Sequence, residues 1–275
     1  MSHLPLWALY YLSDVMFYIL YFFITYRKKV VYENLKNSFP DRSLKEIEVI
    51  SKFFFRHLSD LIFESLKGFS ISVGELQQHY RFTNIELLES YYKNDKSVTI
   101  LGAHYANWEW VALSLPLITK FQTYGIYQTL TDPFMNNVIK KSRERNGMKL
   151  ISKEEVLTTL ENTQSQKITM GYIADQSPSK HGRHYWIKFL NQDTVTMSGF
   201  EHFAKKFNTP VVYLNILKKK RGYYEGTFYP VTDEPQKLAD GEITEIFMKK
   251  LEEIIRKDPP YWLWSHRRWK IKKTH

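Results

Sequence analysis

Residues 97–110 read SVTILGAHYANWEW and give the clearest indication of the fold. The first six form an apolar run bounded by polar residues, which is typical of a buried strand. Gly102 and Asn107 then suit a turn, and a helical pattern extends from Asn107 to Leu115. A strand that passes through a turn into a helix is the repeating unit of α/β proteins.

The same alternation continues along the chain. Strand-like runs cover residues 121–127, 148–152, 168–174, 210–217 and 223–231, and helical patterns cover residues 43–68, 133–145, 153–163, 197–207 and 243–257. The first of these helices begins with the capping box of Ser43 and Glu46. Strands that alternate with helices predict an α/β fold with a central, largely parallel sheet flanked by helices.

The N-terminus predicts a membrane helix that precedes this domain. Leu4 to Thr25 are 22 mostly apolar residues with one charge, Asp14, and the cations at 27–29 follow directly. About 20 such residues cross the hydrocarbon layer, and a basic cluster stays on the cytoplasmic side. We therefore predict a transmembrane or membrane-anchoring helix over residues 1–28 and a single α/β domain over residues 29–275. The alternative is a helix that lies in the membrane interface or is buried in a core.

Composition narrows the function. The 275 residues carry a formal net charge of +10 and 16% aromatic residues. A basic surplus predicts acidic partners such as an anionic membrane, a phosphorylated substrate, an acidic protein or nucleic acid. The chain has no cysteine, which excludes disulfides, thiolate metal sites and a cysteine nucleophile.

The loop after the first strand holds a candidate catalytic pair. His104 and Glu109 are five residues apart, so on one helix or one strand they would face different ways. They converge only if the chain turns between them, which Gly102 and Asn107 allow. A histidine with a carboxylate partner suits general-base chemistry on an acceptor hydroxyl. The alternative is an ordinary loop histidine with a surface glutamate.

Other polar residues lie where sites form in α/β folds. Asp175 follows the apolar strand ending at Ala174, although a turn aspartate is the simpler interpretation. Arg143 and Arg145 come at the end of a predicted helix, where cations also complement the helix dipole. The C-terminal run DPPYWLWSHRRWKIKK alternates tryptophans with cations, which indicates either an interfacial belt or tryptophans packed inward.

Together these motifs resemble a known family. GAHYANWE is similar to the G-x-H-x-G-N-W-E form of the bacterial lipid A biosynthesis (late, secondary) acyltransferases, within the H-x-x-x-x-D/E glycerolipid acyltransferase superfamily. This chain has Ala106 where that family usually has glycine. Further matching segments are NLKNSFPDRS (34–43), DPFMNNVIKKSRERNG (132–147), ADQ (174–176), TMSGFEHFAKKFNTPVV (196–212) and PPYWLWSHRRWK (259–270), the last with Ser265 inserted.

The resemblance implies a membrane-bound enzyme on the cytoplasmic side of a bacterial inner membrane. It would move a fatty acyl group from acyl carrier protein to a hydroxyl of a lipid A precursor. His104 would be the general base and Glu109 its orienting partner, with Asp175, Arg143 and Arg145 as substrate-binding residues. We expect one arginine to bind a substrate phosphate, and Arg145 is favoured because it lies nearer the loop at Gly147. The expected partners are acyl carrier protein, an anionic lipid acceptor and the inner membrane, with no cofactor and no metal.

Two other functions stay open from the sequence. A related membrane acyltransferase acting on a lysophospholipid or an amino-acid lipid would use the same pair of residues. A non-enzymatic nucleic-acid-binding protein would use the basic and aromatic residues, but it would leave the N-terminal helix and the His–Glu motif unexplained.

Overall fold

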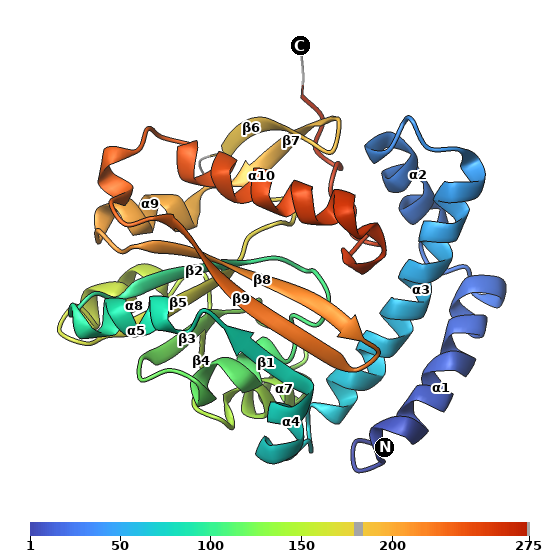
Figure 1. Cartoon of the computed structure of the whole chain (residues 1–275), viewed down its shortest axis with the longest axis horizontal. Coiled ribbons are helices and arrows are strands. Elements are labelled where there is room, and N and C mark those ends of the chain that lie inside the picture. Colours follow the sequence, from blue (N-terminus) through green and yellow to red (C-terminus); the bar gives the residue numbers. More distant parts are fainter. Residues whose placement is uncertain (179–183, 274–275) are drawn as a thin grey trace.

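The computed structural model describes residues 1–178 and 184–273 and confirms the expected α/β fold. A central seven-stranded sheet, in the order β1-β9-β8-β2-β5-β3-β4, is flanked by helices (Figure 1). Its strands are β1 (Tyr80–Thr83), β2 (Val98–Gly102), β3 (Gln122–Ile126), β4 (Lys149–Ile151), β5 (Ile168–Ile173), β8 (Val211–Lys220) and β9 (Tyr223–Thr232). The neighbours from β8 to β4 run parallel, whereas β9 runs antiparallel to β8 and parallel to β1.

The register of two central strands decides where polar loop residues meet. Gly102 at the end of β2 lies opposite Ile173 at the end of β5. Pairing continues one step further, because the Ala174 N–H donates to the Gly102 carbonyl at 3.1 Å. His104 and Asp175 each follow two residues after a strand end, so the parallel strands deliver them side by side at one edge of the sheet.

Helices cover the sheet and also pack at the edge where the loops after β2 and β5 lie. They are α2 (Lys28–Ser38), α3 (Leu44–Lys67), α4 (Val73–His79), α5 (Glu86–Lys93), α6 (Val111–Ser114), α7 (Pro133–Glu144), α8 (Val156–Asn162), α9 (Gly199–Lys206) and α10 (Glu242–Lys257). The capping box at Ser43 is present, with Glu46 hydrogen-bonded to the Ser43 N–H and hydroxyl. In Figure 1, α3 stands at the end of the sheet and α10 lies alongside it, with Phe247 packed against Tyr213 of β8.

A two-stranded antiparallel sheet, β6 (His184–Phe189) with β7 (Gln192–Met197), was missed from the sequence. Its turn consists of Leu190 and Asn191, both with positive φ. Asparagine tolerates that region well, but a leucine there costs free energy and gives no turn signal. Leu190 is fully buried, and its burial offsets that cost.

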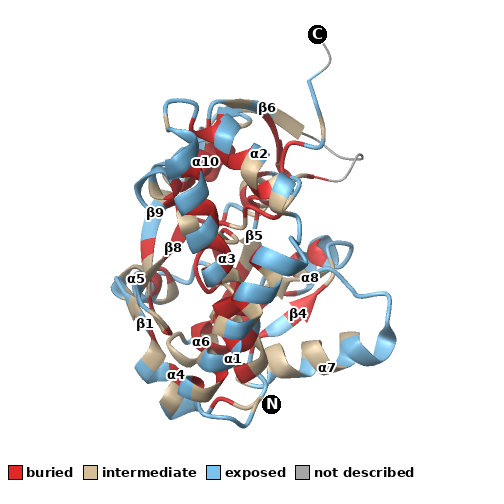
Figure 2. Ribbon diagram, turned by 90° about the vertical axis from the view of Figure 1, so that its right-hand side faces the viewer, coloured by how far each residue is buried: buried red, intermediate tan, exposed pale blue. Residues whose placement is uncertain are grey.

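The N-terminal apolar segment forms α1 (Leu6–Tyr18) followed by a π-helical turn (Ile19–Phe23). By length and composition, Leu6–Phe23 is the one helix among the described residues that could cross a membrane. One face packs on α3, where Ser13 donates to Asp60 (2.7 Å) and Tyr10 donates to Glu64 (2.8 Å). The opposite face is exposed in Figure 2 and carries Trp7, Tyr11, Val15, Tyr18, Phe22 and Phe23.

The C-terminal tryptophans pack inward. Trp262, Trp264 and Trp269 are buried, and the Trp262 ring contacts both others at centroid distances of 4.8 and 6.0 Å. The interpretation of this run as an interfacial belt is therefore wrong. These three large rings stabilise the fold through their buried apolar area and their edge-to-face contacts.

Candidate active site

The centre of the site is a partly buried hydrogen bond between His104 and Asp175. The carboxylate Oδ1 lies 2.7 Å from Nδ1 of His104 and also accepts from the His104 backbone N–H at 3.1 Å. Asp175 is 1% exposed, whereas the His104 side chain is 19% exposed. Because an ionised carboxylate only accepts, Nδ1 carries a proton, and in the neutral ring the lone pair is therefore on Nε2. Nε2 has no hydrogen bond to any described residue, so it is free to take a proton.

Asp175 is held in the ionised state. Burial alone would raise its pKa, but the charge and hydrogen bonds of His104 and a hydrogen bond from the Trp262 indole outweigh burial and keep the pKa below its usual value. Trp262 Nε1 donates to the second carboxylate oxygen at 2.7 Å. The carboxylate therefore has a fixed orientation, with one oxygen for the histidine and one for the tryptophan.

The loop that carries His104 is tied down on both sides. The Leu263 N–H donates to the His104 carbonyl (3.1 Å), and the Ala106 N–H donates to the Tyr261 carbonyl (2.9 Å). Ala106 adopts the left-handed conformation with φ of 52°, which explains why the resembled family usually has glycine here. The left-handed conformation costs an alanine about 1–2 kcal/mol, and the hydrogen bonds of the loop hold it there with its methyl group buried.

Two buried groups of α3 support this loop from below. Glu64 accepts from Asn107 Nδ2 (2.8 Å) and from the Tyr224 hydroxyl (2.7 Å), and burial raises its pKa. His57 Nε2 donates to the Ala106 carbonyl at 3.2 Å, and its Nδ1 accepts from Lys218 at 3.3 Å. Burial, and next the Lys218 charge, hold the pKa of His57 well below its usual value. These residues belong to no sequence motif. Their position as ionisable residues on the apolar stripe of a predicted helix was the one indication of a buried role that the sequence offered.

Glu109 lies on the same loop but binds a different partner. Both Nε and Nη2 of Arg143, from α7, donate to Glu109 Oε2, at 3.2 and 2.6 Å. Among the described residues, the carboxylate hydrogen-bonded to the His104 imidazole is that of Asp175, where the sequence pattern had suggested Glu109. The reason is topological, because the sheet register places Asp175 beside His104, while the turn at 105–108 carries Glu109 toward α7.

Arg145 points away from this ion pair. Its Nη2 donates to the Ile71 carbonyl after α3, and burial lowers its pKa. Arg143 and Arg145 therefore have separate directions, as expected for residues two apart on a helix. The structure brings Arg143, and not Arg145, next to the His104 loop.

Further polar side chains near the pair come from the C-terminal segment. His266 Nε2 accepts from the Ser177 N–H at 3.2 Å, and burial lowers the pKa of His266 to about 4. Arg268 is 1% exposed, and its three guanidinium nitrogens have no acceptor among the described residues. Burial lowers the pKa of Arg268 to about 10, against the attraction of Asp175. The described residues contain no group of three or more side chains suited to a metal ion.

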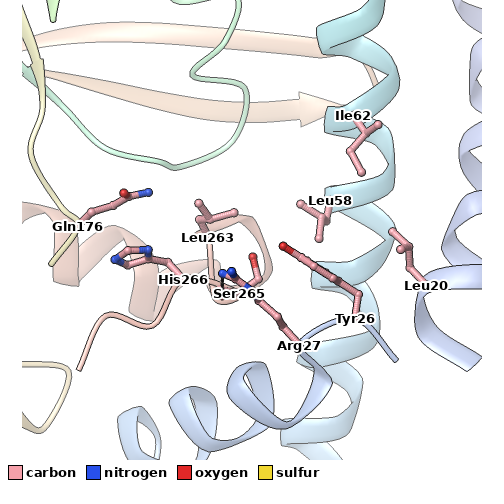
Figure 3. A pocket seen from close by; sticks show the side chains of 9 residues that line it. All are labelled: Leu20, Tyr26, Arg27, Leu58, Ile62, Gln176, Leu263, Ser265 and His266. Atoms are coloured by element: carbon pink, nitrogen blue, oxygen red, sulfur yellow. Dashed lines mark hydrogen bonds between the residues drawn. The ribbon is translucent and has the colours of Figure 1, made fainter. Parts of the chain in front are cut away.

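A cavity of about 510 Å³ is lined in part by chain neighbours and hydrogen-bond partners of this pair, although neither His104 nor Asp175 lines it (Figure 3). Gln176, the neighbour of Asp175, and His266 lie at one end of it. The remaining lining residues are Leu20, Tyr26, Arg27, Leu58, Ile62, Leu263 and Ser265. Its volume falls within the usual range for small-molecule sites.

Fold and site together define an α/β protein with a histidine–aspartate pair at the carboxyl edge of a largely parallel sheet. Comparison with known proteins gives the family. The sequence profile described as bacterial lipid A biosynthesis acyltransferase matches residues 3–271. The chain belongs to this family.

Individual relatives are distant. The chain is 23% identical over 252 residues to a lipid A biosynthesis acyltransferase of Haemophilus influenzae. The matched region covers 90% of this chain and 78% of that protein. The chain is 21% identical over 262 residues to the lipid A biosynthesis palmitoleoyltransferase of Escherichia coli, covering 91% and 81%. A lipid A biosynthesis acyltransferase of Shigella flexneri matches at the same identity and coverage.

Proposed function

We propose that this protein transfers a fatty acyl group from acyl carrier protein to a hydroxyl of a lipid A precursor at the cytoplasmic face of the bacterial inner membrane. The observation that carries the proposal is the His104–Asp175 pair, with Nε2 free, in a chain of the lipid A acyltransferase family. The pair has the geometry of a general base whose tautomer is fixed by a carboxylate.

The reaction follows from that geometry. His104 Nε2 takes the proton of the acceptor hydroxyl as its oxygen attacks the thioester carbonyl. The tetrahedral intermediate then breaks its carbon–sulfur bond, and the imidazolium returns the proton to the leaving thiolate. Asp175 stabilises the imidazolium between these steps, because its buried carboxylate stays charged.

The role of Glu109 in this proposal is to hold Arg143 at the edge of the site. Arg143 gives two nitrogens to Glu109, and its third, which has no hydrogen bond to the described residues, can bind a substrate oxygen. We assign the substrate phosphate to Arg143 in preference to Arg145, which is engaged with the Ile71 carbonyl.

Charge and the N-terminal helix support the choice of partners. A net charge of +10 favours encounter with an acidic carrier protein and with an anionic lipid. The exposed aromatic and aliphatic face of α1 suits insertion into lipid, and Lys28 and Lys29 directly after this segment suit anionic headgroups. The enzyme needs both contacts, because its donor is soluble and its acceptor is a membrane lipid.

The direct test is an assay with the purified full chain in detergent. Acyl carrier protein and coenzyme A thioesters are offered separately against lipid A precursors, a lysophospholipid and an amino-acid lipid, and products are identified by mass spectrometry. We expect acylation of the lipid A precursor from the carrier protein, abolished in His104→Ala. Transfer only to the lysophospholipid or the amino-acid lipid would replace the acceptor, and equal transfer by folded His104→Ala would refute the mechanism.

A further inference from the structure

Arg268 is a buried cation whose donors are unpaired within the described part of the chain. Its side chain is 1% exposed, and none of the three guanidinium nitrogens has an acceptor there. Burial lowers the pKa of Arg268 to about 10, so the side chain stays charged at neutral pH. A guanidinium has five N–H donors, and leaving them unpaired in an interior costs stability. Buried polar groups of native proteins are nearly always hydrogen-bonded, so an unpaired one indicates a functional use.

Arg268 lies in the same region as the catalytic pair. Its backbone N–H donates to the His266 carbonyl at 2.9 Å. His266 Nε2 in turn accepts from the N–H of Ser177, two residues after Asp175, at 3.2 Å. Burial and the charges of Asp175, His104 and Arg268 all act on the pKa of this ring, so these side chains share one region of the interior.

The carboxylate of Asp175 does not satisfy the donors of Arg268. Its Oδ1 accepts from Nδ1 and the backbone N–H of His104, and its Oδ2 accepts from the Trp262 indole. The Asp175 charge opposes the effect of burial on the pKa of Arg268, so the two charges attract each other, but they do so without a hydrogen bond. The guanidinium donors therefore stay available for another oxygen.

The transfer reaction creates two charges, and the site holds a counter-charge for each. As the acceptor oxygen bonds to the thioester carbon, the carbonyl electron pair moves to the carbonyl oxygen, and His104 takes the hydroxyl proton. The intermediate then consists of an oxyanion beside an imidazolium. Asp175 neutralises the imidazolium, and Arg268 is the buried cation that remains for the oxyanion. The electron pair re-forms the carbonyl bond as the carbon–sulfur bond breaks.

We propose that Arg268 is a further catalytic residue, which donates hydrogen bonds to the thioester carbonyl oxygen and binds the oxyanion of the tetrahedral intermediate. The proposal rests on the proposed function and adds the group that stabilises the negative charge. A preorganised donor that is unpaired in the resting protein and paired in the transition state lowers the barrier, because it binds the intermediate more strongly than the substrate.

Substitution of Arg268 tests this role in the transfer assay. Arg268→Met removes the charge and every donor, and we expect kcat to fall about 10²–10³-fold with little change in the KM of either substrate. Arg268→Lys keeps the charge without the planar fork and should recover part of the loss. Arg267→Met is the matched control, because Arg267 is the exposed neighbour in the chain, and its kcat should stay close to that of the parent.

The KM values separate this role from phosphate binding. A raised KM of the phosphorylated acceptor or of the thioester donor, with kcat unchanged, would make Arg268 a ligand of that substrate's phosphate and would overturn the proposal. An unchanged kcat in folded Arg268→Met would also overturn it. Folding is judged by thermal unfolding of the same samples. Should Arg268→Met fail to fold, a kcat of Arg268→Lys equal to that of the parent would overturn the proposal in its place.

A tetrahedral anion tests the same site without turnover. Dodecylphosphonate carries a charged tetrahedral group on an alkyl chain, and dodecanol carries the same chain without charge. Calorimetry on the full chain in detergent should show that Arg268→Met weakens dodecylphosphonate binding by about tenfold or more and leaves dodecanol binding unchanged.

Two results of the calorimetry would overturn the proposal. One is equal phosphonate binding by the parent and Arg268→Met, and the other is an equal loss of phosphonate and dodecanol binding. A parent protein that acylates no lipid, yet binds dodecylphosphonate through Arg268, would refute the proposed function while leaving the anion site intact.

Discussion

Replacing Asp175 by asparagine is the sharpest test of the catalytic pair. The carboxylate accepts three hydrogen bonds, two from His104 and one from Trp262. Asparagine has one acceptor oxygen and one donor NH₂ in the same shape. If the NH₂ faces Trp262, two donors oppose each other, at a cost of about 1–3 kcal/mol. If it faces His104, it opposes the His104 backbone N–H, and the imidazole must accept at Nδ1, which protonates Nε2 and removes the base.

With the asparagine NH₂ toward His104, the clash with the indole is avoided, but His104 then carries its proton on Nε2 and cannot act as a base. Both orientations lose the negative charge that stabilises the imidazolium. We therefore expect kcat to fall by about 10²–10⁴ in Asp175→Asn, with little change in the KM of either substrate. The assay is steady-state transfer from an acyl thioester to the acceptor lipid, with thermal unfolding measured on the same preparation.

Trp262→Phe supplies the control for packing. It removes the indole donor and retains an aromatic ring, so its kcat should fall less than tenfold. In the double variant, the asparagine NH₂ no longer opposes a donor at position 262, so stability should recover relative to Asp175→Asn while activity stays low. A folded Asp175→Asn protein within tenfold of the parent kcat would refute the assignment of Asp175 as the residue that orients His104.

Three further outcomes follow from other contacts. Glu109→Gln and Arg143→Gln should each raise the KM of the phosphorylated acceptor about tenfold or more. The KM of the double variant should be no higher than that of either single variant. Additive increases in KM would show that the two residues do not act as a unit. The unfolded chain binds a proton at His57 near pH 6.5, whereas burial keeps the pKa of His57 in the folded chain well below that value. The free energy of unfolding should therefore fall as the pH drops below about 6.5. His57→Gln should reduce this dependence of the unfolding free energy on pH, measured by denaturant titrations at several pH values. Arg268→Met should leave the melting temperature unchanged or raise it, because a buried cation without a described acceptor costs stability, and a loss larger than that of exposed Arg267→Met would contradict this.

Six strands and most helices of the described chain were predictable because their patterns are local, whereas β1, β6 and β7 were missed. The apolar run ending at Gly102 is β2 within one residue, and the capped helix after Ser43 is α3. The sheet order was not predictable, since nothing in a single strand states its neighbour. That order decides which carboxylate reaches His104. Sequence proximity favoured Glu109, and the pairing of β2 with β5 places Asp175 there instead.

Support for the site was harder to predict because it comes from distant segments. Glu64 and Trp262 lie far from His104 in the chain, and each bonds the loop or its partner in the folded state. Their side chains show no spacing rule that a motif could express. Ala106 is the exception, because a departure from glycine in a resembled motif marked a position that proves to be left-handed.

The N-terminal helix bears on how this protein can be prepared in water. Asp14 on α1 pairs with Arg221 at 2.8 Å, and Arg221 also holds Asp60 at 2.6 Å. Removing the helix would remove hydrogen-bond and ion-pair partners of Asp60, Glu64 and Arg221. It would also expose apolar surface on α3, so the truncated protein would still present an aggregation-prone surface. A protein that is soluble without detergent is better obtained by substituting the exposed apolar residues of the N-terminal helix. Charged or amide side chains in place of the exposed Trp7, Tyr11, Val15, Tyr18, Phe22 and Phe23 would leave the inner hydrogen bonds and ion pairs of the helix intact.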